Sequence, residues 1–186
     1  MSHKKSPSGW DDVAHWYDGW VGKDGSHFHQ KLAIPKLLQS LDLDNNKHIL
    51  DVGCGSGVLA PYIAQSHAGY TGIDISKNLI QKAQQYHAQH GTFLVCDARK
   101  IRHHLPKSAF DSAVFLLSIQ DMNPLNDVIR NVGYCLKAGG TLVILMTHPC
   151  FRIPRQSGWG YEKSKKLQYR RVDRYLTPLN IPMKQH

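Results

Sequence analysis

Long apolar segments are absent from this chain of 186 residues. The best candidate runs from residue 109 to residue 119 and is interrupted by Asp111 and Ser112, whereas a membrane-spanning helix needs about 20 apolar residues. Basic side chains near the first residue are not followed by an apolar stretch, so the sequence predicts no signal peptide. We therefore expect one cytoplasmic domain with no membrane partner, because domains hold about 100–200 residues.

Cysteine is also sparse. The four cysteines lie far apart and form no Cys-x-x-Cys pair: Cys54, Cys96, Cys135 and Cys150. Zinc sites need clustered ligands and disulfide scaffolds need denser cysteines, so we predict reduced thiols that pack in the protein. Histidine is more frequent, but His27 and His29 lack a third ligand nearby. We expect His87 and His90 on a solvated helix face, and we predict no metal site.

Acidic residues are scarce at one end of the chain. The formal net charge is +9, and residues 151–186 hold nine basic residues against Glu162 and Asp173. Three explanations stay open for this basic segment: it binds nucleic acid, it holds an acidic small substrate, or it is a solvated face. Arginine and tyrosine alternate from Tyr169 to Tyr175, which suits base stacking as well as phosphate contact. Charge runs are usually solvated, however, so a nucleic-acid partner is not the favoured interpretation.

Apolar β-rich runs alternate with amphipathic helical segments in the middle of the chain. We expect strands at residues 48–52, 70–75, 92–96, 110–118 and 141–146. Helices are expected after residue 57, over residues 78–90 with Ser76 as N-cap, and from Pro124, and residues 137–140 form a turn. This order predicts an α/β fold, a doubly wound and mainly parallel Rossmann-like sheet.

We divide the chain into three parts on this pattern. Residues 1–47 form an N-terminal helical cap, with a helix after Asp11 and Asp12. Residues 48–147 form the core, and residues 148–186 form a basic segment on the substrate side or at the sheet edge. Within that last segment the run from Tyr169 to Leu176 fits either a helix face or an edge strand.

The first predicted strand leads into a loop with three glycines. A dinucleotide-binding Gly-x-Gly-x-x-Gly/Ala loop requires a small residue at position 58, where this chain has Val58. Asp51 precedes the glycines, and its carboxylate would repel a pyrophosphate but attract a sulfonium. The second strand ends in Asp74, which is placed to accept both hydroxyl groups of a ribose. The loop therefore favours S-adenosyl-L-methionine over NAD, with loop amides facing the ligand.

Five segments in order resemble the class I S-adenosylmethionine-dependent methyltransferases, over residues of about 11–147. They are Asp51 to Gly57, Gly72 to Ser76, Cys96 to Ala98, Phe110-Asp111 and Leu136 to Leu142. The resemblance implies that the acid before the glycines flanks the methionine portion and that the acid after the third strand accepts from adenine. It also implies that an N-terminal tyrosine touches the cofactor. The cofactor-binding set that it implies is Tyr17, Asp51, Gly53, Gly55, Gly57, Asp74, Ile75, Asp97, Ala98, Leu117 and Ser118.

Two residues are candidate catalytic bases. His148 follows the fifth predicted strand and Asp121 follows the fourth, so both are expected near the ligand crevice. The resemblance implies methyl transfer by in-line displacement to an unidentified small molecule with an O, N or C nucleophile. Two alternatives stay open: a cofactor-binding module without turnover, because residues 148–186 leave little to build the family's last helix and strand pair, and an RNA methyltransferase that uses the basic segment.

Overall fold

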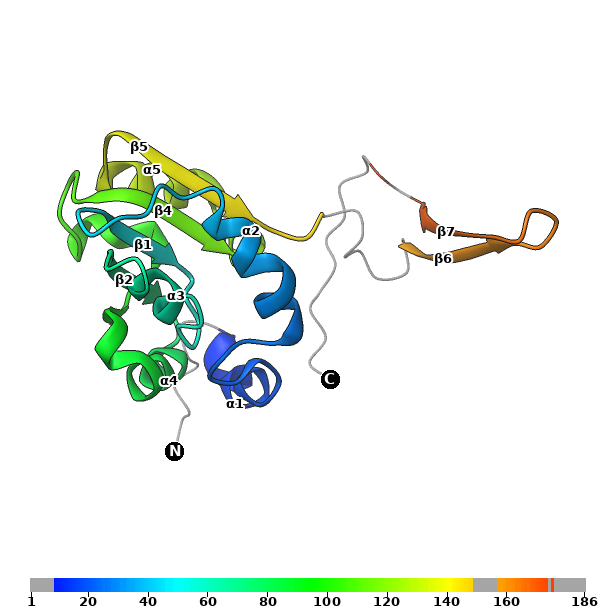
Figure 1. Cartoon of the computed structure of the whole chain (residues 1–186), viewed down its shortest axis with the longest axis horizontal. Helices are drawn as coiled ribbons and strands as arrows, with labels where there is room; N and C mark the ends of the chain where they lie inside the picture. Colours follow the sequence, from blue (N-terminus) through cyan, green and yellow to red (C-terminus); the bar gives the residue numbers. More distant parts are fainter. Residues whose placement is uncertain (1–8, 149–156, 174, 176–186) are drawn as a thin grey trace. The chain divides into compact units, whose positions relative to one another are not determined.

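The computed structural model describes residues 9–148, 157–173 and 175. Contacts between Cα atoms divide the chain into a first unit, residues 1–146, and a second unit, residues 147–186. The first unit contains a parallel five-stranded sheet with the order β3-β2-β1-β4-β5 (Figure 1). Its strands are β1 (His48–Val52), β2 (Gly69–Asp74), β3 (Thr92–Val95), β4 (Phe110–Leu116) and β5 (Leu136–Leu145). The strand order reverses between β1 and β4, which confirms the predicted doubly wound fold.

Helices connect the strands and cover both faces of this sheet. They are α1 (Trp10–Val21), α2 (Ile34–Leu38), α3 (Ala60–Ala64), α4 (Lys77–His87) and α5 (Leu125–Cys135). A π-helical turn over His29–Ala33 precedes α2, and 3₁₀ turns lie at η2 (Ala88–His90), η3 (Ala98–His103) and η4 (Ile119–Asp121). Residues of α2, α3 and α4 share one apolar cluster with the sheet, and residues of α5 and η3 share the other.

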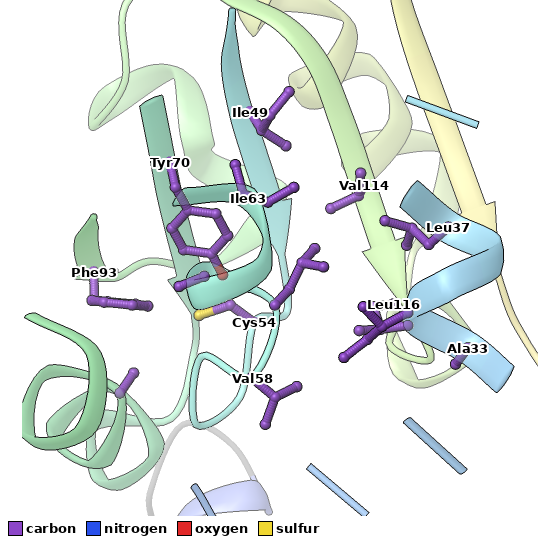
Figure 2. Close-up of a cluster of buried hydrophobic side chains, with 14 of the residues drawn as sticks. Ala33, Leu37, Ile49, Cys54, Val58, Ile63, Tyr70, Phe93, Val114 and Leu116 are labelled. Carbon is purple, nitrogen blue, oxygen red and sulfur yellow. The ribbon is translucent and has the colours of Figure 1, made fainter. Parts of the chain in front are cut away.

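The sequence of β1 shows why the sheet is buried on both faces. Ile49 packs in the first cluster, whereas Leu50 and Val52 pack in the second, and none of the three side chains is exposed. Side chains of a strand alternate between faces, so an apolar run must be covered on both sides. Figure 2 shows the first cluster, in which Ile49 and Val114 of the sheet lie among side chains from the surrounding helices.

The helix predicted over residues 78–90 is shorter in the structure. Ser76 caps α4 as predicted, because its hydroxyl accepts a hydrogen bond from the Leu79 amide at 3.2 Å. The helix ends at His87, and η2 follows it. The prediction of a solvated histidine face is wrong for His87, which is 1% exposed and whose Nε2 lies 3.0 Å from the Lys23 carbonyl oxygen. That contact joins the end of α4 to the segment after α1.

The edges of the last two strands differ from the predicted bounds. β4 ends at Leu116 rather than at Ser118, because Leu117 adopts a left-handed conformation with φ of 56°. β5 begins at Leu136, and its pairing moves from Leu136 to Thr141 while β4 advances from Phe110 to Ser112. The residues 137–140 therefore bulge out of the ladder, where the sequence predicted a turn.

Asp111 ties the amino ends of three strands together. Its carboxylate accepts hydrogen bonds from the Lys137 ammonium, at 2.9 Å to each oxygen, and from the His48 amide at 2.9 Å. Desolvation would raise the pKa of Asp111. The hydrogen bonds from Lys137 and from the His48 amide outweigh it and keep this pKa below its usual value. β1, β4 and the bulge of β5 are thus joined at the end of the sheet opposite to the predicted ligand site.

The second unit contains a β-hairpin. β6 (Ser157–Glu162) and β7 (Leu167–Val172) pair antiparallel as a two-stranded sheet of their own. Tyr169 to Val172 therefore form a strand rather than a helix, and this strand does not join the five-stranded sheet. Over the described ranges, no helix has the length and apolar character needed to cross a membrane.

We expect Phe115→Ala to lower the free energy of unfolding by about 3–5 kcal/mol, because Phe115 of β4 is fully buried in the cluster under α5. Urea unfolding followed by circular dichroism measures this difference. Phe28→Ala is the matched control, since Phe28 is 40% exposed and should lose less than about 1 kcal/mol. Equal losses for the two variants would contradict the assignment of β4 to the core.

Candidate functional site

The glycine loop begins where β1 ends, beside the end of β4. The amides of Gly53 and Cys54 both donate to the Ile73 carbonyl oxygen, at 2.8 and 3.0 Å. Gly53 has φ of 77°, and a β-carbon there would lie 2.6 Å from Cβ of Ser118. Ser118 in turn donates from its hydroxyl to the Val52 carbonyl oxygen at 2.6 Å. Only glycine fits this crossing, so Gly53 allows the carboxyl ends of β1 and β4 to approach closely.

Asp74 connects the glycine loop to the start of α4. One carboxylate oxygen accepts from the Gly55 amide at 2.9 Å, and the other accepts from the Ser76 amide at 2.8 Å. Burial raises the pKa of Asp74, and the two amide hydrogen bonds oppose that rise. The sequence predicted that loop amides face a ligand. The Gly55 amide instead holds the carboxylate that was predicted to bind ribose.

Asp51 is a buried carboxylate without full compensation. Its Oδ2 accepts from the Tyr70 hydroxyl at 2.7 Å, and the residue is 1% exposed. Burial raises the pKa of Asp51 to about 7; the Tyr70 hydrogen bond lowers it, and the nearby Asp74 raises it further. A carboxylate in this setting is stabilised most by a positive charge close to it. The site therefore favours a cationic ligand.

Buried oxygens without a partner gather at the same edge. Within the described ranges, Oδ1 of Asp51, Oγ of Ser56 and Oε1 of Gln120 are buried and have no hydrogen-bond partner. Asp51 and Ser56 lie at the end of β1 and in the glycine loop, and Gln120 lies in η4 just after β4. Most buried polar atoms in proteins are hydrogen-bonded, so a cluster of exceptions fits a site for a polar ligand.

Tyr17 brings α1 over the glycine loop. A β-carbon on Gly55 would lie 3.4 Å from the ring and from the hydroxyl of Tyr17. The ring of Trp10 meets that of Tyr17 edge-on, with 5.7 Å between centroids. Burial raises the pKa of the Tyr17 phenol, and Asp74 and Asp51 add to this effect. Tyr17 therefore lies close to both buried carboxylates, as expected for a residue that covers a bound ligand.

Asp11 fastens α1 to α4, a role that the sequence did not predict. The sequence placed Asp11 before a helix, but α1 begins at Trp10. Oδ1 of Asp11 accepts from the Ser76 hydroxyl at 2.6 Å and from the Asn78 amide at 3.2 Å. A second contact joins Asp18 to Lys82 at 3.1 Å. These partners are more than 60 residues apart in the chain, so no local sequence pattern predicts the contacts.

Asp97 has a partner within the protein. Arg99 donates to both oxygens of its carboxylate, and the shortest of these contacts is 2.6 Å. The hydrogen bonds from Arg99 hold the pKa of Asp97 below its usual value. This ion pair was missed, although an acid and an arginine two residues apart after a strand are visible in the sequence. Ile75 and Ala98, the neighbouring predicted residues, are half-buried.

The remaining predicted residues fall into two groups. Leu117 and Ser118 lie at the end of β4 and are half-buried, beside the glycine loop. Asp121 closes η4 and is exposed. His148 belongs to the second unit, is exposed, and stacks on Tyr175 with 6.0 Å between ring centroids. Cys150, predicted to pack in the protein, lies outside the described residues.

Two surface hollows of the first unit lie away from the glycine loop. One, of about 250 Å³, is lined by Asp42, Lys47, Asp111 and the bulge of β5. The other, of about 320 Å³, is a groove between α1 and α4.

We expect Asp11→Ala to loosen α1, because the variant lacks the acceptor for Ser76 and Asn78. Loss of about 1–2 kcal/mol of local stability would make amide exchange in α1 about 5–30 times faster. Hydrogen–deuterium exchange with mass spectrometry measures this. Asp12→Ala is the matched control, since Asp12 is exposed on the same turn and its exchange should match the parent protein. If both variants exchanged alike, Asp11 would not be the fastening residue.

Comparisons with known proteins agree with the observed fold. A family described as a methyltransferase domain matches residues 50–144. An O-methyltransferase of Pyrenophora dematioidea is 31% identical over 143 residues, which cover 74% of this chain and 53% of that protein. A ubiquinone biosynthesis O-methyltransferase of Vibrio vulnificus is 28% identical over 132 residues, covering 70% and 56%. The chain thus spans about half the length of the curated relatives it matches.

A solved structure is also similar. The crystal structure of an S-adenosylmethionine-dependent methyltransferase from Mesorhizobium loti superposes with a TM-score of 0.69 at 27% sequence identity. The match covers 83% of this chain and 68% of that protein. This likeness supports the doubly wound fold of the first unit.

Proposed function

The chain belongs to the methyltransferase domain family of the class I S-adenosylmethionine-dependent superfamily, and on that premise we propose that it methylates a hydroxyl oxygen of a small molecule. The methyl donor is S-adenosyl-L-methionine, bound at the carboxyl edge of β1, β2 and β4. The observation that carries the proposal is the buried Asp51 carboxylate, whose pKa is raised to about 7 and whose Oδ1 has no hydrogen-bond partner among the residues that the structure describes. Oxygen is chosen as the acceptor because the curated relatives described above are named O-methyltransferases.

Asp74 is proposed to hold the ribose. Each carboxylate oxygen has two lone pairs, and each is used once by the amides of Gly55 and Ser76. The remaining lone pairs suit the two hydroxyl groups of a ribose. Because those amides fix the carboxylate, it is oriented before the ligand arrives, which reduces the entropy lost on binding. Adenine would then lie toward Ile75 and Ala98, the half-buried residues after β2 and β3.

Asp97 is proposed to meet the adenine amino group while it stays paired with Arg99. The guanidinium fixes the carboxylate and lowers its pKa, so the group is an ionised acceptor at neutral pH. Leu117 and Ser118 would line the same cavity from the end of β4. These roles follow the family resemblance, position by position.

Asp51 is proposed to stabilise the positive charge of the donor. S-adenosyl-L-methionine, when bound, supplies a methyl group on a cationic sulfur, which reacts without a metal or further activation. Asp51 lies below the loop of Gly53, Gly55 and Gly57, where its charge is little screened because water is excluded. Tyr17 covers the loop and excludes water from the reacting groups. The protein then contributes chiefly alignment and exclusion of solvent.

A hydroxyl acceptor must lose a proton, and two residues are proposed to take it. Asp121 follows β4 in η4, and His148 follows β5. A neutral imidazole can take up that proton near neutral pH, and a carboxylate can accept it during the transfer and release it to water. Either residue acts only on the acceptor, so neither is required for binding of the methyl donor.

We expect S-adenosyl-L-methionine, and not NAD, to raise the melting temperature of the protein and to support transfer of a labelled methyl group to phenolic test acceptors.

Asp74→Ala should weaken binding of the donor by at least about tenfold, since hydrogen bonds to charged groups contribute about 1.5–3 kcal/mol. Calorimetric titration measures the affinity. The control is Asp42→Ala, because Asp42 is an acidic surface residue whose side chain is 92% exposed.

Three results of this experiment would count against the proposal. Stabilisation by NAD alone would exclude the assigned donor. Donor affinity unchanged in Asp74→Ala would exclude the ribose assignment. Tight binding without transfer to any acceptor would identify a cofactor-binding module without turnover.

Donor affinity should rise with pH between 6 and 8. A cation binds the ionised form of Asp51, and its pKa of about 7 means that most molecules carry a proton there at pH 6. The dissociation constant should therefore be about tenfold larger at pH 6 than at pH 8. In Asp51→Asn the affinity should be lower and independent of pH over this range, which separates Asp51 from titration of the ligand itself. The same slope in both proteins would contradict this role.

A further inference from the structure

The two faces of the hairpin in the second unit differ in character. The register pairs Trp159 with Arg170 and Tyr161 with Gln168. Side chains alternate along a strand and paired residues share a face, so these four residues lie on one face of the hairpin. We call them the aromatic face. On the other face, Gly158 and Gly160 lie opposite Arg171 and Tyr169.

The glycines of β6 accommodate Tyr169 on the face opposite to the aromatic face. A β-carbon on Gly160 would lie 2.5 Å from the Tyr169 ring, so this ring lies directly against the backbone of β6. Tyr169 packs against β6 on that face and is still 45% exposed. Trp159 and Tyr161, on the aromatic face, remain 67% and 60% exposed. Two large rings exposed side by side on a strand indicate a surface that binds something.

A guanidinium group lies among these rings. The Arg170 guanidinium carbon is 5.4 Å from the centroid of the Trp159 ring, a cation–π geometry. The contact holds the planar arginine beside the planar indole. Gln168 adds amide donors and an acceptor next to Tyr161. The aromatic face thus offers stacking surfaces, a fixed positive charge and hydrogen-bonding groups together.

Positive charge continues into the turn of the hairpin. Lys163, Lys165 and Lys166 form the turn between β6 and β7, and none of the turn residues is apolar. Glu162 pairs with Lys165 at 3.1 Å, and Asp173 pairs with Arg171 at 2.9 Å. The basic residues of the hairpin outnumber its acids, so a partner that carries regular negative charge is favoured.

We propose that the aromatic face binds single-stranded RNA, with bases stacked on Trp159 and Tyr161 and phosphates held by Arg170 and the turn lysines. Aromatic side chains on adjacent positions of a sheet, with basic residues between them, are the arrangement that stacks successive bases. The two rings are two residues apart on β6, about 6.7 Å along the strand. This function is additional to methyl transfer and does not depend on it.

The composition of the hairpin favours RNA over an anionic membrane. A hairpin that inserts into lipid needs apolar residues at its tip, whereas this tip is lysine and serine. Trp159 lies in the middle of β6 and Tyr161 near its end, and the residues paired with them are the polar Arg170 and Gln168. Flat contact with alternating planar and charged groups suits a nucleic-acid strand better than a lipid interface.

Fluorescence anisotropy with the full chain and a labelled ten-nucleotide uridine RNA tests the proposal. We expect binding that weakens steeply with salt, because each phosphate contact releases counterions. Trp159→Ala should weaken binding at least about fivefold, the lower limit for loss of one stacked base. Arg170→Ala should also reduce the salt dependence of the affinity. The RNA should quench tryptophan fluorescence in the parent protein but not in Trp159→Ala.

Two matched controls test whether RNA binding depends on the hairpin residues or on any exposed tryptophan or arginine. Trp20→Ala removes a tryptophan of α1 that is 64% exposed, and Arg130→Ala removes an arginine of α5 whose side chain is 67% exposed. Both variants should bind RNA like the parent protein. The proposal is overturned if Trp159→Ala binds RNA unchanged, or if the parent protein ignores RNA at low salt. Binding to phosphatidylserine vesicles in the absence of RNA binding would assign the aromatic face to a membrane surface instead.

Discussion

Burial of negative charge at the point where the strand order reverses is the constraint on which the site depends. Asp51 and Asp74 lie near the carboxyl ends of the neighbouring strands β1 and β2, and desolvation raises the pKa of both. Asp74 is compensated by amides of the glycine loop and of α4. Asp51 receives only the hydroxyl of Tyr70. The carboxyl edge of the sheet therefore holds a buried negative charge, which a cation close to it would stabilise.

The same deficit explains why several elements converge there. Tyr17 reaches the loop from α1, and Asp11 fixes that helix to Ser76 at the start of α4. Ser76 also donates its amide to Asp74, so one short chain of hydrogen bonds runs from α1 to the Asp74 carboxylate. The position of α1 and the orientation of the Asp74 carboxylate thus both depend on contacts with Ser76. A protein that opens to admit a ligand must disturb both.

The sequence predicted the fold well because its signals are local. The alternation in β1, the serine before α4 and the spacing of the glycines each operate over a few residues, and the predicted sheet is confirmed. Contacts between distant segments were missed: Asp11 with Ser76, and the burial of His87 against Lys23. Helical spacing alone cannot show that another segment covers a face. The assigned roles of the site residues stay predictions, since their chemistry depends on a ligand.

The bulge over residues 137–140 lies at the end of the sheet opposite to the proposed site. Its lysine joins the amino ends of β1 and β4 through Asp111, whereas the chemistry is assigned to the opposite ends of these strands. β4 has seven residues, so the two ends are about 20 Å apart. Ala138 of this bulge is exposed, whereas Gly139 has φ of 77°, at which a side chain would be strained. A spectroscopic label attached at this corner would report on the integrity of the sheet while leaving turnover undisturbed.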